Sequence, residues 1–294
     1  DGAHGAHFLW AGLPDAVACG ADVVIQSLHK TLPALTQTAL IHINGSLVNR
    51  ERIRKMLSVY QTSSPSYVLM ASISQCMTWL EQEGPEQFER YKRQAGELRK
   101  RLANMKQLYL YEPRADFDWG KLVICSRNVS GREVYDCLRE DYGLQMEMAS
   151  AGYILAMTTV GDSPEGFERL AEALETIDFE LQRPGAEAKR RGAMKIRAVR
   201  GNGTAPEALA MSERCMEIDR AVIRPTEEVP LEKAAGRVMG DYLYLYPPGV
   251  PMLVPGEVIQ MRHIEQVKNY LHQGLEVHGG YSKESGNVKV ILHH

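Results

Sequence analysis

One stretch of the chain indicates its fold class, DVVIQSLHK at residues 22–30. Asp22 to Gln26 form a short run rich in β-branched side chains, which is typical of a buried strand. A second run of this kind, Ala39 to Ile43, ends at the turn signal Asn44-Gly45. Two such strands, with helical patterns around them, predict βαβ units and a parallel sheet that carries helices on its faces.

Helical patterns follow these strands. Residues 49–83 are predicted to be helical with a break at 62–66, where serines can cap the helix that follows. Pro85 suits the first turn of a long amphipathic helix. Apolar residues that recur every three or four positions form its buried stripe: Phe88, Tyr91, Ala95, Leu98, Leu102 and Met105.

Residues 107–180 predict a separate, compact unit with the order β-α-β-β-α. Its three strand-like segments are Leu122 to Cys125, Leu144 to Met148 and Tyr153 to Val160. Ser130 and Glu133 have the spacing of a capping box, so a helix is expected to begin there. A last helix is expected to start at Ser163-Pro164, with an apolar side that includes Phe167.

These patterns divide the chain into four parts. Residues 1–84 belong to one domain, and residues 85–181 form a small α/β domain. Residues 182–206 gather lysine and arginine without aromatic side chains, which favours a solvated linker over an RNA-binding patch. Residues 207–294 regain globular patterning, with a helix at 261–271 and a strand at 288–292.

Composition narrows the classes of function. The 294 residues carry a net charge of −3, which gives no general attraction to nucleic acid or membranes. No apolar run approaches the roughly 18 residues of a membrane span. The five cysteines are scattered without a CxxC pair, which argues against a zinc site or a disulfide framework and favours the reducing cytoplasm. No metal site is expected.

Lys30 is the first candidate catalytic residue. Ser27 and His29, two positions apart in an extended backbone, share one side from which both can donate to a phosphate. Taken alone, a lysine after a strand is usually a surface residue. Asp1 changes this interpretation, because a Schiff-base lysine and an aspartate that faces a pyridine nitrogen together suit pyridoxal phosphate (PLP) chemistry.

The N-terminal segment supplies the second half of this pattern. If Asp1 lies in a strand beside the strand before Lys30, Ala3 shares its face and Gly2 points away. Asp1 can then keep the pyridine nitrogen protonated, while the small side chain of Ala3 lets the ring lie flat. His4 would line the mouth of the strand. For this segment alone, an ordinary strand end remains the alternative.

Five runs of sequence together resemble the Orn/Lys/Arg decarboxylase family. They are DGAHGAHF (residues 1–8), QSLHKTLPALTQT (26–38), TSSPSY (62–67), PLEKAAGRV (230–238) and YPPGVPMLVPGE (246–257). The resemblance implies a PLP enzyme of the aspartate-aminotransferase fold. Residues 1–84 would be the C-terminal part of its large PLP-binding domain, followed by a small α/β domain and an α/β C-terminal decarboxylase domain.

The resemblance also implies roles for individual residues. The residues that it assigns to the cofactor are Asp1, Ala3, His4, Ser27, His29, Lys30, Ser63 and Ser64. Lys30 would form the Schiff base and Asp1 would pair with the pyridine nitrogen. Ser63 or Ser64 would contact the phosphate bound by a partner subunit, because the family's active sites lie at a dimer interface. Glu257 would bind the distal cation of the substrate, which is chemically sensible for a carboxylate.

The implied reaction is α-decarboxylation of a basic amino acid, with arginine converted to agmatine for polyamine biosynthesis. Lysine and ornithine are the next substrates to consider. Two alternatives stay open: another reaction on the same fold, such as transamination, and a non-catalytic relative.

The chain departs from the family pattern in two places. Gly2 stands where the family usually has glutamate, and a glycine there can loosen a strand. The chain also begins at Asp1 without a methionine, so we expect residues that stack on the ring and cradle the phosphate to precede it. On that expectation, these 294 residues alone bind PLP poorly and are inactive.

Overall fold

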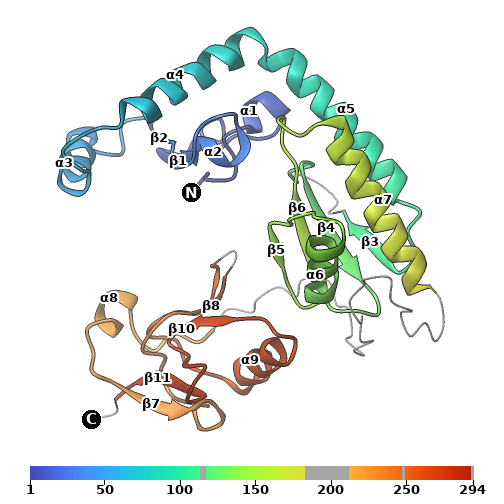
Figure 1. Cartoon of the computed structure of the whole chain (residues 1–294). Coiled ribbons are helices and arrows are strands. Elements are labelled where there is room, and N and C mark those ends of the chain that lie inside the picture. The colour runs from blue at the N-terminus through green and yellow to red at the C-terminus, as the bar shows by residue number, and fades with distance from the viewer. Residues whose placement is uncertain (113–116, 183–211, 247–248, 293–294) are drawn as a thin grey trace. The chain divides into compact units, whose positions relative to one another are not determined.

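The computed structural model describes residues 1–112, 117–182, 212–246 and 249–292 (Figure 1). The chain divides into two compact units. The first comprises Asp1–Asn104, Glu112–Leu122 and Met157–Glu175, and the second comprises Met105–Tyr111, Val123–Ala156 and Thr176–His294. The predicted linker, from residue 183 onward, lies outside the described residues. The predicted domain boundaries stay predictions.

The strands β1 (Val23–Ser27) and β2 (Ala39–Ile43) match the two predicted runs, but they pair antiparallel. Val23 lies opposite Ile43, and Ser27 lies opposite Ala39. The predicted parallel pairing is wrong for these two strands. A parallel crossover usually needs a full helix that packs on the sheet, whereas residues 28–38 connect these strands with a single turn of helix, α2 (Leu28–Thr31).

Four helices complete the described part of the N-terminal region: α1 (Phe8–Ala11), α3 (Arg50–Tyr60), α4 (Tyr67–Gln82) and α5 (Gly84–Leu102). The predicted break separates α3 from α4, and the Ser66 side chain caps α4 by accepting from Leu69 N. The predicted apolar stripe of α5 is buried through Leu102, where the helix ends before Met105. α1 packs against α5, where a Cβ on Gly84 would lie 3.3 Å from the Trp10 ring.

A four-stranded sheet has the order β3-β4-β6-β5, built from β3 (Leu108–Tyr111), β4 (Lys121–Ser126), β6 (Tyr153–Met157) and β5 (Met148–Ala149). β4 confirms a predicted strand. β3 was not among the predicted strands, and the strand expected over 144–148 shortens to the two residues of β5.

Two helices accompany this sheet. α6 (Gly131–Asp141) begins with the predicted capping box of Ser130 and Glu133. α7 (Pro164–Leu181) begins at the predicted Pro164, and its apolar residues Phe167, Leu170, Leu174 and Ile177 are buried. Local sequence signals therefore predict where both helices begin.

The C-terminal region forms two small sheets, β10-β8-β9 and β11-β7. Its elements are α8 (Ile218–Ala221), β7 (Thr226–Pro230), a 3-10 turn (Leu231–Lys233), β8 (Leu243–Leu245), β9 (Pro251–Leu253), α9 (Met261–His272), β10 (Val277–Gly279) and β11 (Asn287–Ile291). The predicted helix and strand of this region are confirmed as α9 and β11. Met239, Leu253, Val267 and Val290 are fully buried in its core.

Candidate functional site

Lys30 lies in α2, directly after β1. Leu28 begins this turn: its side chain is buried, and its backbone N donates to Thr38 O at 3.0 Å. Lys30 itself is half-buried, and its Nζ lies 3.2 Å from Nε2 of His4. The structure therefore brings together the lysine and one residue of the N-terminal motif.

The N-terminal motif approaches β1 but does not form a strand. Gly2 N donates to Ile25 O at 2.8 Å, and turns follow from Ala3 onward. A Cβ on Gly2 would lie 3.1 Å from Val24 Cγ1, so this position faces β1 at close range. Asp1 is exposed, and its Oδ1 accepts from Ala3 N at 2.9 Å. The condition that Asp1 lies in a strand is therefore not met, although its segment does neighbour the strand before Lys30.

Ser27 and His29 do not share an extended backbone. Ser27 is the last residue of β1, and His29 belongs to the helical turn α2. The argument that both side chains point to one side of a strand is therefore wrong, because the chain turns helical at Leu28. Both residues are half-buried next to Lys30 in sequence, and their roles stay predictions.

The three remaining candidates lie apart from this motif in sequence. Ser63 and Ser64 are exposed in the loop between α3 and α4. Glu257 lies after β9 in a tight turn where Gly256 has a φ of +93° and a Cβ would collide with Met216 O. Its Oε2 accepts from Val254 N at 2.9 Å, so the turn orients the carboxylate. Glu257 and Lys30 belong to different compact units.

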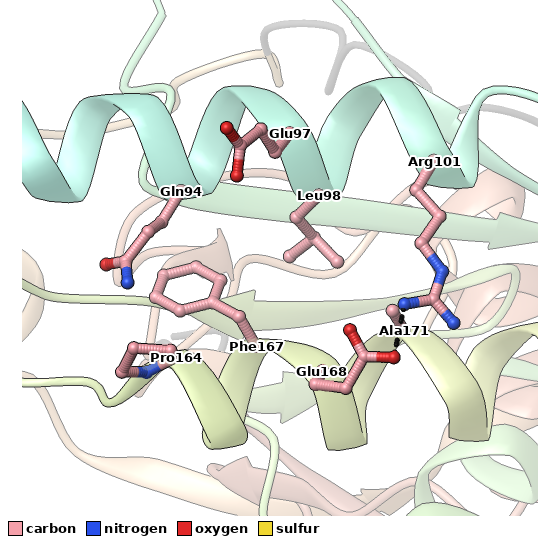
Figure 2. A pocket seen from close by; sticks show the side chains of 8 residues that line it. All are labelled: Gln94, Glu97, Leu98, Arg101, Pro164, Phe167, Glu168 and Ala171. Carbon is pink, nitrogen blue, oxygen red and sulfur yellow. Dashed lines mark hydrogen bonds and ion pairs between the residues drawn. The ribbon is translucent and has the colours of Figure 1, made fainter.

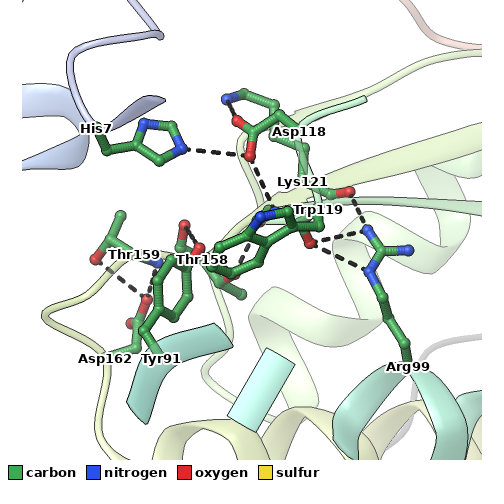
Figure 3. Close-up of polar contacts among 10 residues, drawn as sticks. His7, Tyr91, Arg99, Asp118, Trp119, Lys121, Thr158, Thr159 and Asp162 are labelled. Carbon is green, nitrogen blue, oxygen red and sulfur yellow. Dashed lines mark hydrogen bonds and ion pairs between the residues drawn. The ribbon is translucent and has the colours of Figure 1, made fainter. Parts of the chain in front are cut away.

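A second polar cluster was not among the predicted site residues (Figure 3). His7 is buried, and its Nε2 lies 3.3 Å from Oδ1 of Asp118. Lys121 Nζ lies 2.5 Å from the other carboxylate oxygen. Burial of Asp118 opposes ionisation, but the hydrogen bonds and charges of His7 and Lys121 prevail and lower its pKa to about 2. Sequence offered no signal for this pair, because 111 positions separate its members.

Asp118 lies in a loop whose backbone is fixed by hydrogen bonds from several side chains. Tyr91 donates its hydroxyl hydrogen to Thr158 O at 2.6 Å, and Thr158 Oγ1 donates to Gly120 O at 2.8 Å. Burial raises the pKa of Tyr91, so its hydroxyl stays protonated and keeps donating. The Arg99 guanidinium donates to the backbone carbonyls of Trp119 and Lys121 (Figure 3). These contacts make the loop a rigid support for the Asp118 carboxylate.

A groove of about 260 Å³ lies between α5 and the first part of α7 (Figure 2). Leu98, Phe167 and Ala171 contribute apolar surface to it. The Arg101 guanidinium at its edge is already paired with Glu168 and Glu175, each at 2.7 Å. None of the predicted site residues lines the groove, and its volume is below the usual range of ligand sites, about 300–1,000 Å³. We therefore do not assign the chemistry to it.

The described residues contain no cluster of three or more His, Cys, Asp or Glu side chains that could hold a metal ion. Their helices also include none that is long and apolar enough to cross a membrane.

Comparison with known proteins decides the family. Residues 1–193 match the major domain of the Orn/Lys/Arg decarboxylases, and residues 205–289 match their C-terminal domain. The chain belongs to the Orn/Lys/Arg decarboxylase family. Members of this family are in general PLP-dependent decarboxylases that act on amino acids.

Curated relatives and solved structures agree with this assignment. The chain is 31% identical to an arginine decarboxylase of Bacillus subtilis and 29% identical to one of Bacillus anthracis. Each alignment covers 99% of this chain and 59% of the relative, so the chain spans less than two thirds of these proteins. A lysine decarboxylase of Francisella novicida shares the fold, with a TM-score of 0.72 and 18% identity over 92% of this chain and 49% of that one. The α/β fold of a PLP-dependent decarboxylase is thereby confirmed.

Proposed function

We propose that the protein carrying this chain is a PLP-dependent decarboxylase of basic amino acids, with arginine as the first substrate to test. The observation that supports this most directly is the contact between Lys30 Nζ and His4 Nε2 at 3.2 Å. It joins two of the five sequence runs on which the family resemblance rests, residues 1–8 and 26–38. The names of the Bacillus relatives favour arginine over lysine and ornithine.

The residues around Lys30 fit the chemistry of the cofactor. Lys30 offers a primary amine for a Schiff base, His4 offers an imidazole beside it, and Asp1 offers a carboxylate for a pyridine nitrogen. Thr31 adds a buried hydroxyl that has no hydrogen-bond partner among the described residues. A buried polar atom without a partner is costly unless a ligand or water satisfies it. The Thr31 hydroxyl can therefore form a hydrogen bond to a polar ligand.

Each residue has a proposed task. PLP, when bound, draws electrons away from the substrate α-carbon, which makes loss of CO2 accessible. Lys30 would anchor the cofactor through its amine, and Asp1 would hold a proton on the pyridine nitrogen. Ala3 and His4 would pack near the ring. Ser27 and His29 would donate to the phosphate.

Glu257 is the proposed partner of the substrate's distal cation. An ionised carboxylate has about four acceptor sites, so the hydrogen bond from Val254 N orients the group and leaves acceptor capacity for a guanidinium or ammonium.

The proposal includes a homodimer in a reducing, cytoplasmic setting. Ser63 and Ser64, the proposed contacts to a partner's phosphate, are flanked by exposed apolar side chains of α3 and α4: Val59, Tyr60, Tyr67, Val68 and Met70. We call these five residues the apolar helical surface. Tyr60 is 85% exposed and Tyr67 78% exposed, and exposed apolar side chains that gather in one region suit a protein interface. All five cysteines are unpaired, as is common in the cytoplasm.

The test is release of labelled CO2 from carboxyl-labelled arginine, lysine and ornithine, with added PLP. The protein is expressed from its own gene, because this chain covers only 59% of the length of its Bacillus relatives. We expect CO2 from at least one of the three, fastest from arginine, and none from Lys30→Ala. Labelled keto acid without CO2 would indicate a transaminase instead. Failure to process any of the three would contradict the proposal.

A further inference from the structure

We propose that His7 and Asp118 form a positioning pair, which holds Asp1 and His4 in the geometry that the chemistry at Lys30 requires. This inference rests on the proposed function and adds two residues that touch neither cofactor nor substrate in it. The pair also links residues 1–84 to residues 85–181, which are expected from the sequence to be different domains.

The first support is the burial of both side chains. The His7 and Asp118 side chains are 4% and 10% exposed, so both have lost most of their water. Loss of one partner would leave the other group buried without its hydrogen bond, which is unfavourable in a buried pair. The two side chains therefore hold one another in a defined position.

The second support is a continuous path from His7 to the N-terminal motif. Gly5 N donates to Gly2 O at 2.8 Å, and Phe8 N donates to Gly5 O at 3.1 Å. His7 O accepts from Ala11 N at 2.9 Å, which ties it to α1. Because successive turns connect Gly2 to α1, a displacement of the His7 ring is transmitted to the backbone of the N-terminal motif.

The third support is that Asp118 is itself fixed. Its Oδ1 accepts from Gly120 N at 3.0 Å, and its Oδ2 is paired with Lys121. A Cβ on Gly120 would collide with the Tyr91 hydroxyl, so the loop is closely packed against α5. The carboxylate therefore acts as a rigid reference point for His7 (Figure 3).

The fourth support concerns the two nitrogens of the His7 ring. A carboxylate only accepts, so Nε2 donates to Asp118. Nδ1 is buried and has no hydrogen-bond partner among the described residues. The ring orientation then depends on the bond to Asp118, together with its edge contact to Phe8 at 5.0 Å. Removal of the carboxylate leaves no other described polar group to hold the ring.

The experiment compares four variants of the protein expressed from its own gene. Asp118→Asn weakens the acceptor, and His7→Leu removes the donor. His7→Gln keeps an N–H donor near the position of Nε2. Asp162→Asn is the matched control, since this exposed carboxylate belongs to the same compact unit but accepts only from Thr159 among the contacts described. The readouts are kcat, KM, and the visible absorbance band of bound PLP.

We expect kcat to fall ~100-fold in Asp118→Asn and His7→Leu, as misplacement of reacting groups by about 1 Å can cause. KM should change much less, and the absorbance band should shift or weaken. His7→Gln should recover kcat to within about tenfold of the wild type. Asp162→Asn should match the wild type in all three readouts.

Other outcomes would separate the two proposals. If the wild type shows a PLP band and turnover, and Asp118→Asn and His7→Leu match it, the positioning role is wrong and the proposed function stands. If Asp118→Asn does not fold, the comparison of His7→Gln with His7→Leu decides: equal losses would overturn the positioning role, and recovery in His7→Gln supports it. A wild type without any band or turnover would contradict the proposed function itself.

Discussion

Single residues in this chain differ in how far sequence reveals their role. Lys30 and His4 stand in motifs with recognisable chemistry, and the structure places their side chains in contact. His7 and Asp118 carry no such motif, because a histidine in an apolar segment and an aspartate before a strand are common. Their pairing depends on tertiary structure, which local patterns do not encode.

Asp178 offers a test at the residue scale. It is 5% exposed, and its carboxylate accepts from the backbone N–H groups of Lys106, Gln107 and Leu108 at 2.7–3.0 Å. Asp178→Ala would leave these donors without that acceptor at the start of β3. An unsatisfied buried donor costs about 1–3 kcal/mol. The hydrogen bond from Leu108 is buried and the other two are partly buried, so we expect the free energy of unfolding in urea to fall by about 3 kcal/mol in total.

Asp178→Asn is the matched variant, because its amide oxygen can still accept. It should lose less than half as much stability as Asp178→Ala. Equal losses in the two variants would show that the charge or the packing, and not the hydrogen bonds, explains the role of Asp178.

At the scale of elements, local sequence signals predict most of the helices but not the pairing of β1 with β2. The capping box of α6 and the proline at the start of α5 were visible because they act within one turn of helix. Sequence does not predict the antiparallel pairing of β1 and β2, because residues 28–38 are compatible with either a crossover to a parallel strand or a short connection to an antiparallel one. Leu28 decides between them: its side chain is buried and its backbone N donates to Thr38 O, so residues 28–38 turn back and β2 returns antiparallel to β1.

Gly131 tests how α6 meets its sheet. A Cβ at this position would collide with the backbone oxygens of Tyr153 and Ser150. We expect Gly131→Ala to lower the melting temperature and to cost about 3 kcal/mol, because backbone atoms of the sheet would have to move. This loss should occur although alanine is the better helix former by about 1 kcal/mol.

Gly96 in α5 is the control for this substitution. A Cβ there would meet nothing within 4 Å outside its own helix backbone. Gly96→Ala should therefore stabilise the protein by about 1 kcal/mol. If Gly131→Ala also stabilised it, the close packing of α6 against the sheet would be refuted.

At the scale of the whole molecule, family membership follows from motifs at both ends of the chain, whereas association with a second subunit must be tested.

The apolar helical surface predicts that the protein is at least a dimer. A Tyr60→Glu/Val68→Glu variant should sediment as a smaller species, because charges on both exposed positions oppose burial. Ile223→Glu adds a charge at another exposed position, 81% accessible, and should sediment like the wild type. Unchanged sedimentation of the double variant would contradict the proposed interface.

Sequence singles out Lys30 because Schiff-base chemistry requires a lysine, and the motif around it narrows the choice; its role stays a prediction. The role of Glu257 also stays a prediction, because Glu257 and Lys30 belong to separate compact units. The same distinction holds across the molecule: motifs identify chemistry, and only tertiary or quaternary structure brings distant motifs together.

The most direct measurement of the central claim is chemical trapping of the lysine. The protein is incubated with PLP and reduced with borohydride, which converts a Schiff base into a stable secondary amine, and its peptides are mapped by mass spectrometry. The account predicts a pyridoxyl group on the peptide that contains Lys30, and no such label at this position in Lys30→Ala. A label on another lysine, with Lys30 unmodified in the wild type, would contradict the account.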